Sequence, residues 1–130
     1  MELVIGGRAQ GKLEYVKQNM ANQNYLVLDG QGLDIDFSKD HGEEPLILNH
    51  LHLFIRKSLK EGGNPEKEIK DFISKYNNLI IISDEIGNGI VPIDSFERDY
   101  RERTGRLLIE LAKEADKVTR VFCGIGQVIK

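Results

Sequence analysis

Short apolar runs alternate with segments of helical periodicity along this chain of 130 residues. The runs LVIGG, NYLVLDG, PLILN, NLIIIS and KVTRVFC predict strands near residues 3–7, 24–30, 45–49, 78–83 and 118–123. Apolar residues three or four positions apart predict helices between these runs, at 11–21, 50–60, 65–76 and 94–115. Strands that alternate with helices in this order indicate an α/β layered fold with a mainly parallel sheet.

Two of the expected helices carry sequence signals at their first residues. Asn64 precedes Pro65, which is the usual order of a capping residue and the first helical residue. Asp94 and Glu97 have the spacing of a capping box. The polar, acidic stretch at 31–44 has no clear period, so we expect a loop there. Because 40% of the residues are hydrophobic, the chain can bury one core, and we expect a single domain over residues 1–130.

Charge and cysteine content narrow the classes of function. The 18 basic and 21 acidic residues are well mixed and give a net charge of -3, which argues against nucleic-acid partners and anionic membranes. No apolar run approaches the roughly 20 residues that would cross a bilayer. The single cysteine, Cys123, excludes an internal disulfide framework and fits a reducing compartment. We therefore expect a cytoplasmic protein.

The segment between the first expected strand and the first expected helix carries a candidate phosphate-binding loop. Gly6, Gly11 and Lys12 follow the pattern G-x-x-x-x-G-K, in which backbone N–H groups and the helix dipole hold phosphate. The next residue is normally Ser or Thr, whose hydroxyl ligates magnesium, but here it is Leu13. The candidate nucleotide-binding residues are thus Gly6, Gly7, Arg8, Gly11, Lys12 and Leu13, without a metal ligand. The alternative is a glycine-rich turn with an exposed lysine.

Acidic residues and histidines supply the other candidates. Asp84 and Glu85 follow a buried strand, where a carboxylate can hold magnesium or orient an attacking group; the alternative is a pair of solvated acids. His50 and His52 are expected on different faces of a helix and are not assigned to a metal. His41 is expected as an exposed loop histidine. Four arginines of the long helix alternate with acids and predict a salt-bridged surface: Arg98, Arg101, Arg103 and Arg106.

The C-terminal half contains a more specific pattern. It reads E-x-G-x-G-I-V-P at 85–92, followed by Gly-Arg at 105–106, Ala-Asp at 115–116 and Gly-Ile-Gly at 124–126. This pattern resembles the bifunctional adenosylcobinamide kinase/adenosylcobinamide-phosphate guanylyltransferase family of cobalamin biosynthesis. The stretch VIGGRAQGK is similar to the opening of that family. Together the matches cover about two thirds of the chain in the right order.

The resemblance implies a P-loop NTPase-like three-layer sandwich with a mainly parallel central sheet. Family members phosphorylate the hydroxyl of the cobinamide aminopropanol arm and then transfer GMP from GTP through a guanylylated histidine. The resemblance also implies that the protein binds GTP or ATP with Mg²⁺, that its substrate is a corrinoid and that it assembles into homo-oligomers. Gly6, Gly11 and Lys12 would contact the triphosphate, and Glu85 would lie at the active-site edge of the sheet.

The chain departs from the family pattern at the residues that would carry chemistry. Leu13 replaces the metal-binding hydroxyl, Asn49 aligns with an acidic residue, and Leu108 and Ile109 replace an Asn-Gln pair. The chain is also shorter than family members between residues 29 and 45, where the guanylylated histidine is usually found.

His41, in the acidic loop, is not a convincing replacement for that histidine, so we expect guanylyl transfer to be lost. Two hypotheses remain open. The protein is either a reduced cobinamide kinase or a non-catalytic relative with a binding, assembly or regulatory role.

Overall fold

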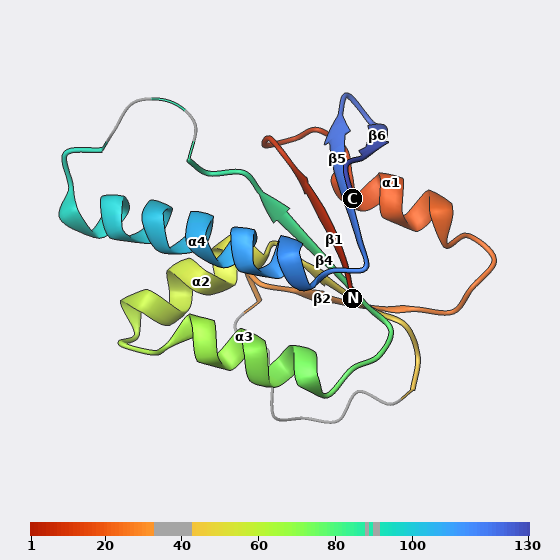
Figure 1. The fold of residues 1–130 in the computed structure, drawn as a ribbon, viewed down its shortest axis with the longest axis horizontal. Coiled ribbons are helices and arrows are strands. Elements are labelled where there is room, and N and C mark those ends of the chain that lie inside the picture. Colours follow the sequence, from red (N-terminus) through yellow and green to blue (C-terminus); the bar gives the residue numbers. More distant parts are fainter. Residues whose placement is uncertain (33–42, 88, 90–91) are drawn as a thin grey trace.

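The computed structural model describes residues 1–32, 43–87, 89 and 92–130. Helices and strands alternate along the chain (Figure 1). The strands are β1 (Glu2–Gly6), β2 (Leu26–Asp29), β3 (Leu46–Asn49), β4 (Leu79–Asp84), β5 (Lys117–Phe122) and β6 (Ile125–Val128). The helices are α1 (Lys12–Asn19), α2 (Leu51–Lys60), α3 (Pro65–Ser74) and α4 (Ser95–Glu114).

The six strands form one sheet in the order β2-β3-β4-β1-β5-β6. Every neighbouring pair is parallel except β5–β6, which is antiparallel. Strand β1 is central, and its last residue Gly6 is in register with Asp84 at the end of β4. Asp29 and Asn49 end β2 and β3 in the same way. The carboxyl ends of these four strands therefore meet at one edge of the sheet.

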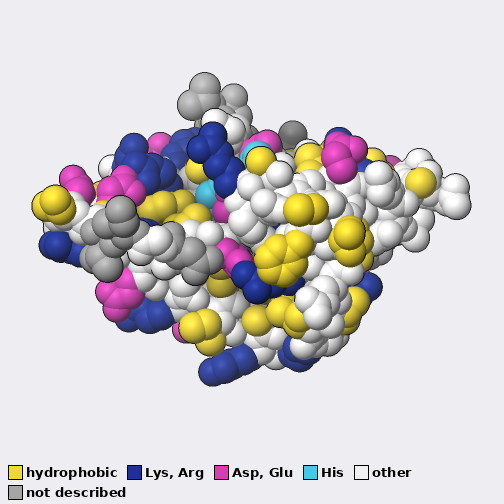
Figure 2. All heavy atoms as spheres, turned by 90° about the horizontal axis from the view of Figure 1, so that it is seen from above, with side chains coloured by type: hydrophobic (Ala, Val, Ile, Leu, Met, Phe, Trp, Pro, Cys, Tyr) yellow, Lys and Arg dark blue, Asp and Glu magenta, His cyan; other side chains and the backbone are white. Residues whose placement is uncertain are grey.

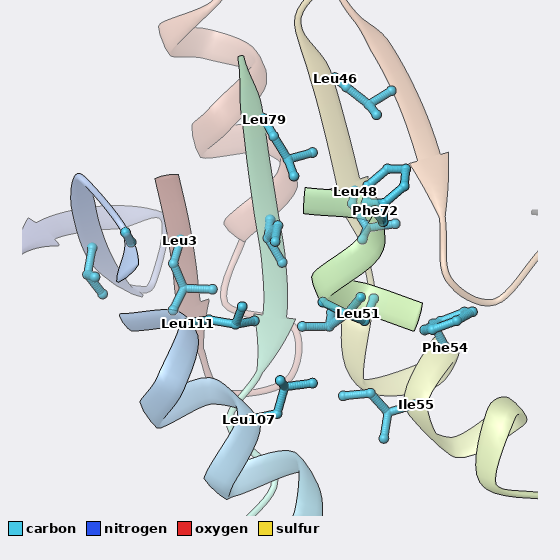
Figure 3. Close-up of a cluster of buried hydrophobic side chains, with 14 of the residues drawn as sticks. Leu3, Leu46, Leu48, Leu51, Phe54, Ile55, Phe72, Leu79, Leu107 and Leu111 are labelled. Atoms are coloured by element: carbon cyan, nitrogen blue, oxygen red, sulfur yellow. The ribbon is translucent and has the colours of Figure 1, made fainter. Parts of the chain in front are cut away.

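Helices cover both faces of the sheet and produce three layers. Helices α2, α3 and α4 lie on one face, and α1 lies on the other (Figure 1). Successive strand residues point to opposite faces, so Leu3 packs with the side of α2–α4 and Val4 packs with Val16 of α1. Figure 3 shows the larger cluster, in which Leu107 and Leu111 of α4 face the strands. The α/β sandwich with a mainly parallel sheet is confirmed.

The expected helix starts are found where the sequence places them. Asn64 caps α3, since its side chain accepts a hydrogen bond from the Lys67 backbone N–H at 3.2 Å. Asp94 caps α4 through the N–H groups of Phe96 and Glu97. The Glu97 carboxylate forms a two-pronged ion pair with Arg56 of α2. Glu97 thus joins α4 to α2.

Strand β6 was not predicted by the sequence pattern, which ended the sheet at residue 123. Cys123 and Gly124 form a two-residue turn with φ values of 49° and 76°, and the chain returns antiparallel to β5. Positive φ at both central residues is the geometry that matches the twist of a tight hairpin. The expectation of a single last strand was therefore wrong by one strand.

Across residues 1–32, 43–87, 89 and 92–130, no helix is long and apolar enough to cross a membrane.

Candidate functional site

The loop between β1 and α1 contains the candidate phosphate-binding residues. Gly11 adopts the left-handed conformation, with φ of 83°, immediately before the first residue of α1. A Cβ atom on Gly6 would lie 2.6 Å from the carbonyl oxygen of Val121, so only glycine fits there. No described side chain caps the start of α1, and its first residues line the cleft described below. A helix start whose N–H groups have no side-chain cap favours the binding of an anion.

The β5–β6 turn braces this loop. The Cys123 N–H donates to Gln10 Oε1 at 2.7 Å, and the Gly124 N–H donates to the Gln10 carbonyl oxygen at 2.8 Å. A Cβ atom on Gly11 would meet the Gly124 Cα at 3.3 Å. The hairpin that the sequence pattern missed therefore holds the candidate loop in place.

Lys12 is buried, with 7% of its side chain exposed. Its Nζ lies 2.6 Å from Asp84 Oδ1 and donates to the Gly7 carbonyl oxygen at 2.6 Å. The alternative of a turn with an exposed lysine does not describe this arrangement. Lys12 instead places a buried positive charge between the loop and the end of β4.

His52, in the first turn of α2, contacts Asp84 through both ring nitrogens. The Asp84 backbone N–H donates to Nδ1 at 3.1 Å, and Nε2 lies 3.3 Å from Asp84 Oδ2. Because Nδ1 accepts a hydrogen bond, the neutral ring carries its proton on Nε2. Burial lowers the pKa of His52, which agrees with a neutral ring. The Tyr100 hydroxyl donates to the His52 carbonyl oxygen at 2.8 Å, and burial raises the pKa of Tyr100 to about 12.

A second polar group lies at the ends of β2 and β3. His50 adopts the left-handed conformation, with φ of 57°, between β3 and α2. Its Nδ1 lies 3.0 Å from Asp29 Oδ1 and 3.4 Å from Asn49 Nδ2. The Gln31 N–H also donates to Asp29 Oδ1 at 2.9 Å, which fixes the carboxylate.

One cleft of about 680 Å³ at the carboxyl edge of the sheet is lined by Lys12, Asn49, His50, His52 and Asp84 together with other residues. Its lining residues are Arg8, Ala9, Gln10, Gly11, Lys12, Leu13, Glu14, Gln31, Asn49, His50, His52, Leu53 and Asp84. The starts of α1 and α2 both face it, so two helix dipoles add positive potential to that of Arg8 and Lys12. Acidic and basic side chains are interspersed on the face seen in Figure 2, with histidine side chains among them.

Asp84 and Glu85 are equivalent candidates in the sequence, but their side chains have different surroundings in the structure. Among the described residues that line the cleft, Asp84 is present and Glu85 is not. Glu85 Oε2 lies 2.9 Å from Arg120 Nη2, and the Arg120 guanidinium lies 4.4 Å from the centre of the Phe122 ring. The structure thus brings the side chain of Asp84, rather than that of Glu85, to the candidate phosphate-binding loop.

Leu13 packs against the apolar cluster around Val16 and also lines the cleft. It offers no oxygen to a metal ion. The part of the chain that the structure describes contains no group of three or more histidine, cysteine or acidic ligands. Mg²⁺ is commonly held by one or two carboxylates together with substrate phosphates. Asp84, beside Lys12 and lining the cleft, fits this role for an ion that arrives with a nucleotide.

The remaining sequence candidates include two histidines and the arginines of α4. His50 and His52 were expected on different faces of a helix, but His50 precedes the helix and the two ring centres are 5.6 Å apart. Arg103 pairs with Glu66, and Arg106 with Glu102, as expected for a salt-bridged surface.

Two expectations concern other positions. Leu108 packs against the core, whereas Ile109 is largely exposed. His41, together with Ile90 and Val91 of the quoted pattern, lies outside the described residues.

Sequence reasoning did not connect Asp29, His50 and His52 with the loop. The signal that could have found them is their position, because each lies at or just beyond the carboxyl end of an expected parallel strand.

Comparison with known proteins shows which family and which proteins this chain is similar to. A sequence model described as cobinamide kinase / cobinamide phosphate guanyltransferase matches residues 18–129, beginning after the candidate loop. The bifunctional adenosylcobalamin biosynthesis protein CobU of Salmonella typhimurium is 40% identical over 52 residues, which cover 40% of this chain and 29% of that protein. The protein of the same name from Escherichia coli is 38% identical over 52 residues, with the same shares.

The matches to these two curated relatives span less than a third of their length. The family match covers most of the chain, and the α/β structure with a mainly parallel sheet is consistent with it. The chain therefore belongs to the cobinamide kinase / cobinamide phosphate guanyltransferase family.

Proposed function

We propose that this protein binds the triphosphate of GTP or ATP at residues 6–13 and transfers the terminal phosphoryl group to a hydroxyl of a cobinamide-type corrinoid. One observation carries the proposal. Lys12 Nζ is buried beside Asp84 at the start of α1, within the cleft that the ends of the parallel strands form. Phosphoryl transfer depends mainly on positioning and on charge neutralisation, and this arrangement supplies both.

Each group in the cleft has a role in this proposal. The N–H groups at the start of α1, together with Lys12 and Arg8, hold phosphate oxygens. Asp84 contributes one carboxylate to a magnesium ion that the nucleotide brings, and that ion would neutralise phosphate charge. Binding must exchange the contact between Lys12 and Asp84 for contacts with the ligand.

Guanylyl transfer is not part of the proposed function. The chain is short between Asp29 and Pro45, where the resemblance places the nucleophile, and His41 is not a convincing replacement. Incubation with GTP should leave the intact mass of the protein unchanged. A stable GMP adduct that disappears in His41→Ala would contradict this expectation.

A second candidate function is nucleotide or anion binding without turnover. The observation that favours it is the position of Leu13, whose side chain packs with the core where a metal-binding hydroxyl is expected. In this case the protein would act in assembly or regulation of corrinoid metabolism.

Titration calorimetry with GTP and ATP, with and without Mg²⁺, followed by a turnover assay on cobinamide, separates these candidates. Lys12→Met should abolish nucleotide binding. Lys70→Met is the matched control, because Lys70 pairs with Glu110 on the exposed surface and does not line the cleft. Binding with turnover supports the kinase, and binding without turnover supports the second candidate. If Lys12→Met binds nucleotide as well as the unmodified protein, the site itself is wrong.

The proposal also includes a single domain over residues 1–130, a cytoplasmic location and self-association. Exposed apolar side chains on β6, Ile125 and Val128, support self-association. Light scattering would measure the oligomeric state, and one cooperative unfolding transition is expected of a single domain.

A further inference from the structure

His50 and Asp29 form a pair with the geometry of an oriented imidazole. Nδ1 of His50 lies 3.0 Å from Asp29 Oδ1, while 36% of the histidine side chain is exposed. When Nδ1–H donates to a carboxylate, the other nitrogen, Nε2, is left as the proton acceptor. Nε2 of His50 makes no hydrogen bond to any residue that the structure describes.

The backbone holds this pair in a position that the chain does not adopt freely. His50 has a positive φ of 57°, which is uncommon for a residue other than glycine. Gly30, directly after Asp29, passes so close that a Cβ atom would lie 2.2 Å from the His50 carbonyl oxygen. Unusual backbone conformations persist where the surroundings determine them, and they cluster at active sites. The ends of β2 and β3 are therefore fitted to each other around this histidine.

Two other polar residues of the cleft, His52 and Asp84, are engaged differently. Both ring nitrogens of His52 face Asp84, and the Asp84 carboxylate lies between Lys12 and His52. Neither can take a proton from a substrate without losing these contacts. His50 combines an oriented ring with a nitrogen that remains available.

We propose that His50 is the general base of the phosphoryl transfer described above and that Asp29 is the residue that positions it. This inference rests on the proposed function. The acceptor hydroxyl gives its proton to His50 Nε2 while its oxygen forms a bond to the terminal phosphorus. The bond between that phosphorus and its bridging oxygen breaks, and the nucleoside diphosphate leaves. The Asp29 carboxylate stabilises the imidazolium, which then releases its proton to water.

Replacement of His50 tests the assignment directly. His50→Asn suits the site, because Asn tolerates the left-handed conformation and cannot accept the proton. General bases typically contribute about 10²–10⁴-fold, so kcat with cobinamide should fall by at least roughly 10²-fold. Nucleotide binding, measured by calorimetry, should be retained. His50→Gln should behave in the same way.

The pH profile separates a base from a residue that only supports the fold. The titratable and charged groups that share the cleft with His50 are Arg8, Lys12, Glu14, His52 and Asp84, and Asp29 contacts it directly. In the unmodified protein kcat should fall on the acidic side as His50 takes up a proton, and this limb should be absent in His50→Asn.

Asp29→Asn and a matched control test the positioning role. Loss of the carboxylate disfavours the imidazolium, so the acidic limb should move to lower pH. Asp71→Asn, on the exposed surface of α3, removes an equivalent charge away from the cleft and should leave the limb in place. Nitrogen NMR of labelled histidine should show the Nδ1–H tautomer for His50 in the unmodified protein.

The outcomes distinguish this inference from the function on which it rests. If the unmodified protein binds nucleotide but never phosphorylates cobinamide, the proposed function fails, and the base falls with it. If it does turn over while His50→Asn keeps the same kcat and acidic limb, only the base assignment is overturned. A phosphoryl adduct on His50 in intact-mass spectra would also overturn it, because the histidine would then be a nucleophile.

Discussion

Replacing Asp84 with Asn removes the negative charge that faces the buried Lys12 and keeps the size of the side chain. Lys12 Nζ now lies 2.6 Å from Asp84 Oδ1, and the two side chains are 7% and 16% exposed. In the variant, Lys12 would keep its hydrogen bond to the Gly7 carbonyl oxygen. Its charge would have no opposite charge beside it.

The magnitude follows from the burial of this pair. Removal of one partner of a buried ion pair costs about 3–5 kcal/mol, because the remaining charge is left uncompensated. The Asn oxygen can still accept a hydrogen bond from Lys12, so we expect the lower end, about 3 kcal/mol of the free energy of unfolding. A bound phosphate chain supplies the missing charge and should stabilise Asp84→Asn more than the unmodified protein.

Urea unfolding at pH 7, with and without inorganic tripolyphosphate, measures both effects. Glu85→Gln is the matched control, since Glu85 is the adjacent acid and pairs with the half-exposed Arg120 outside the cleft. It should cost at most about 1 kcal/mol and respond to tripolyphosphate like the unmodified protein. The double variant Lys12→Met/Asp84→Asn removes both charges and should recover much of the loss.

The reasoning fails if Asp84→Asn unfolds at the same urea concentration as the unmodified protein. It also fails if tripolyphosphate stabilises the two proteins equally, because an anion at Lys12 cannot then be replacing the carboxylate.

Three further predictions concern Leu13, His52 and Gly30. Leu13→Ser supplies a hydroxyl at the magnesium position and should make nucleotide binding more dependent on Mg²⁺ in calorimetry. An unchanged dependence on Mg²⁺ would show that residue 13 does not lie beside the metal position. Burial lowers the pKa of His52 from its ordinary value of 6.5, so the unfolded chain takes up a proton that the folded chain does not. The free energy of unfolding should therefore fall as pH drops below about 6.5, and His52→Gln should reduce this fall in urea titrations at several pH values. Gly30→Ala places a Cβ atom 2.2 Å from the His50 carbonyl oxygen and should cost about 1–3 kcal/mol in thermal unfolding; a stable variant would show that the two strand ends adjust freely.

The sequence predicts the order of elements because each depends on local chemistry. Apolar runs form the buried strands, and Asn64 and Asp94 satisfy the first N–H groups of their helices wherever the helices pack. The glycines of the 6–11 segment likewise act through their own backbone. The sequence pattern did not predict β6, because a four-residue strand with an internal glycine has little β pattern of its own.

The arrangement of the cleft depends on distant residues and could not be read from spacing. His50 and His52 were placed by helical spacing, but the left-handed backbone of His50 breaks that spacing. Whether Asp84 or Glu85 faces the loop depends on the face of the sheet that α1 covers. The face of the sheet that α1 covers is fixed only when β1 lies between β4 and β5.

The contacts of Gln10 with the β5–β6 turn connect positions 113 residues apart. During synthesis, Gln10 leaves the ribosome long before Cys123, so the loop lacks these hydrogen bonds until the final strand pair has formed. Closing such a long segment costs entropy that only the completed sheet repays. A ligand that binds the ordered loop therefore selects chains whose last hairpin is in place, and it couples phosphate binding to the final step of folding.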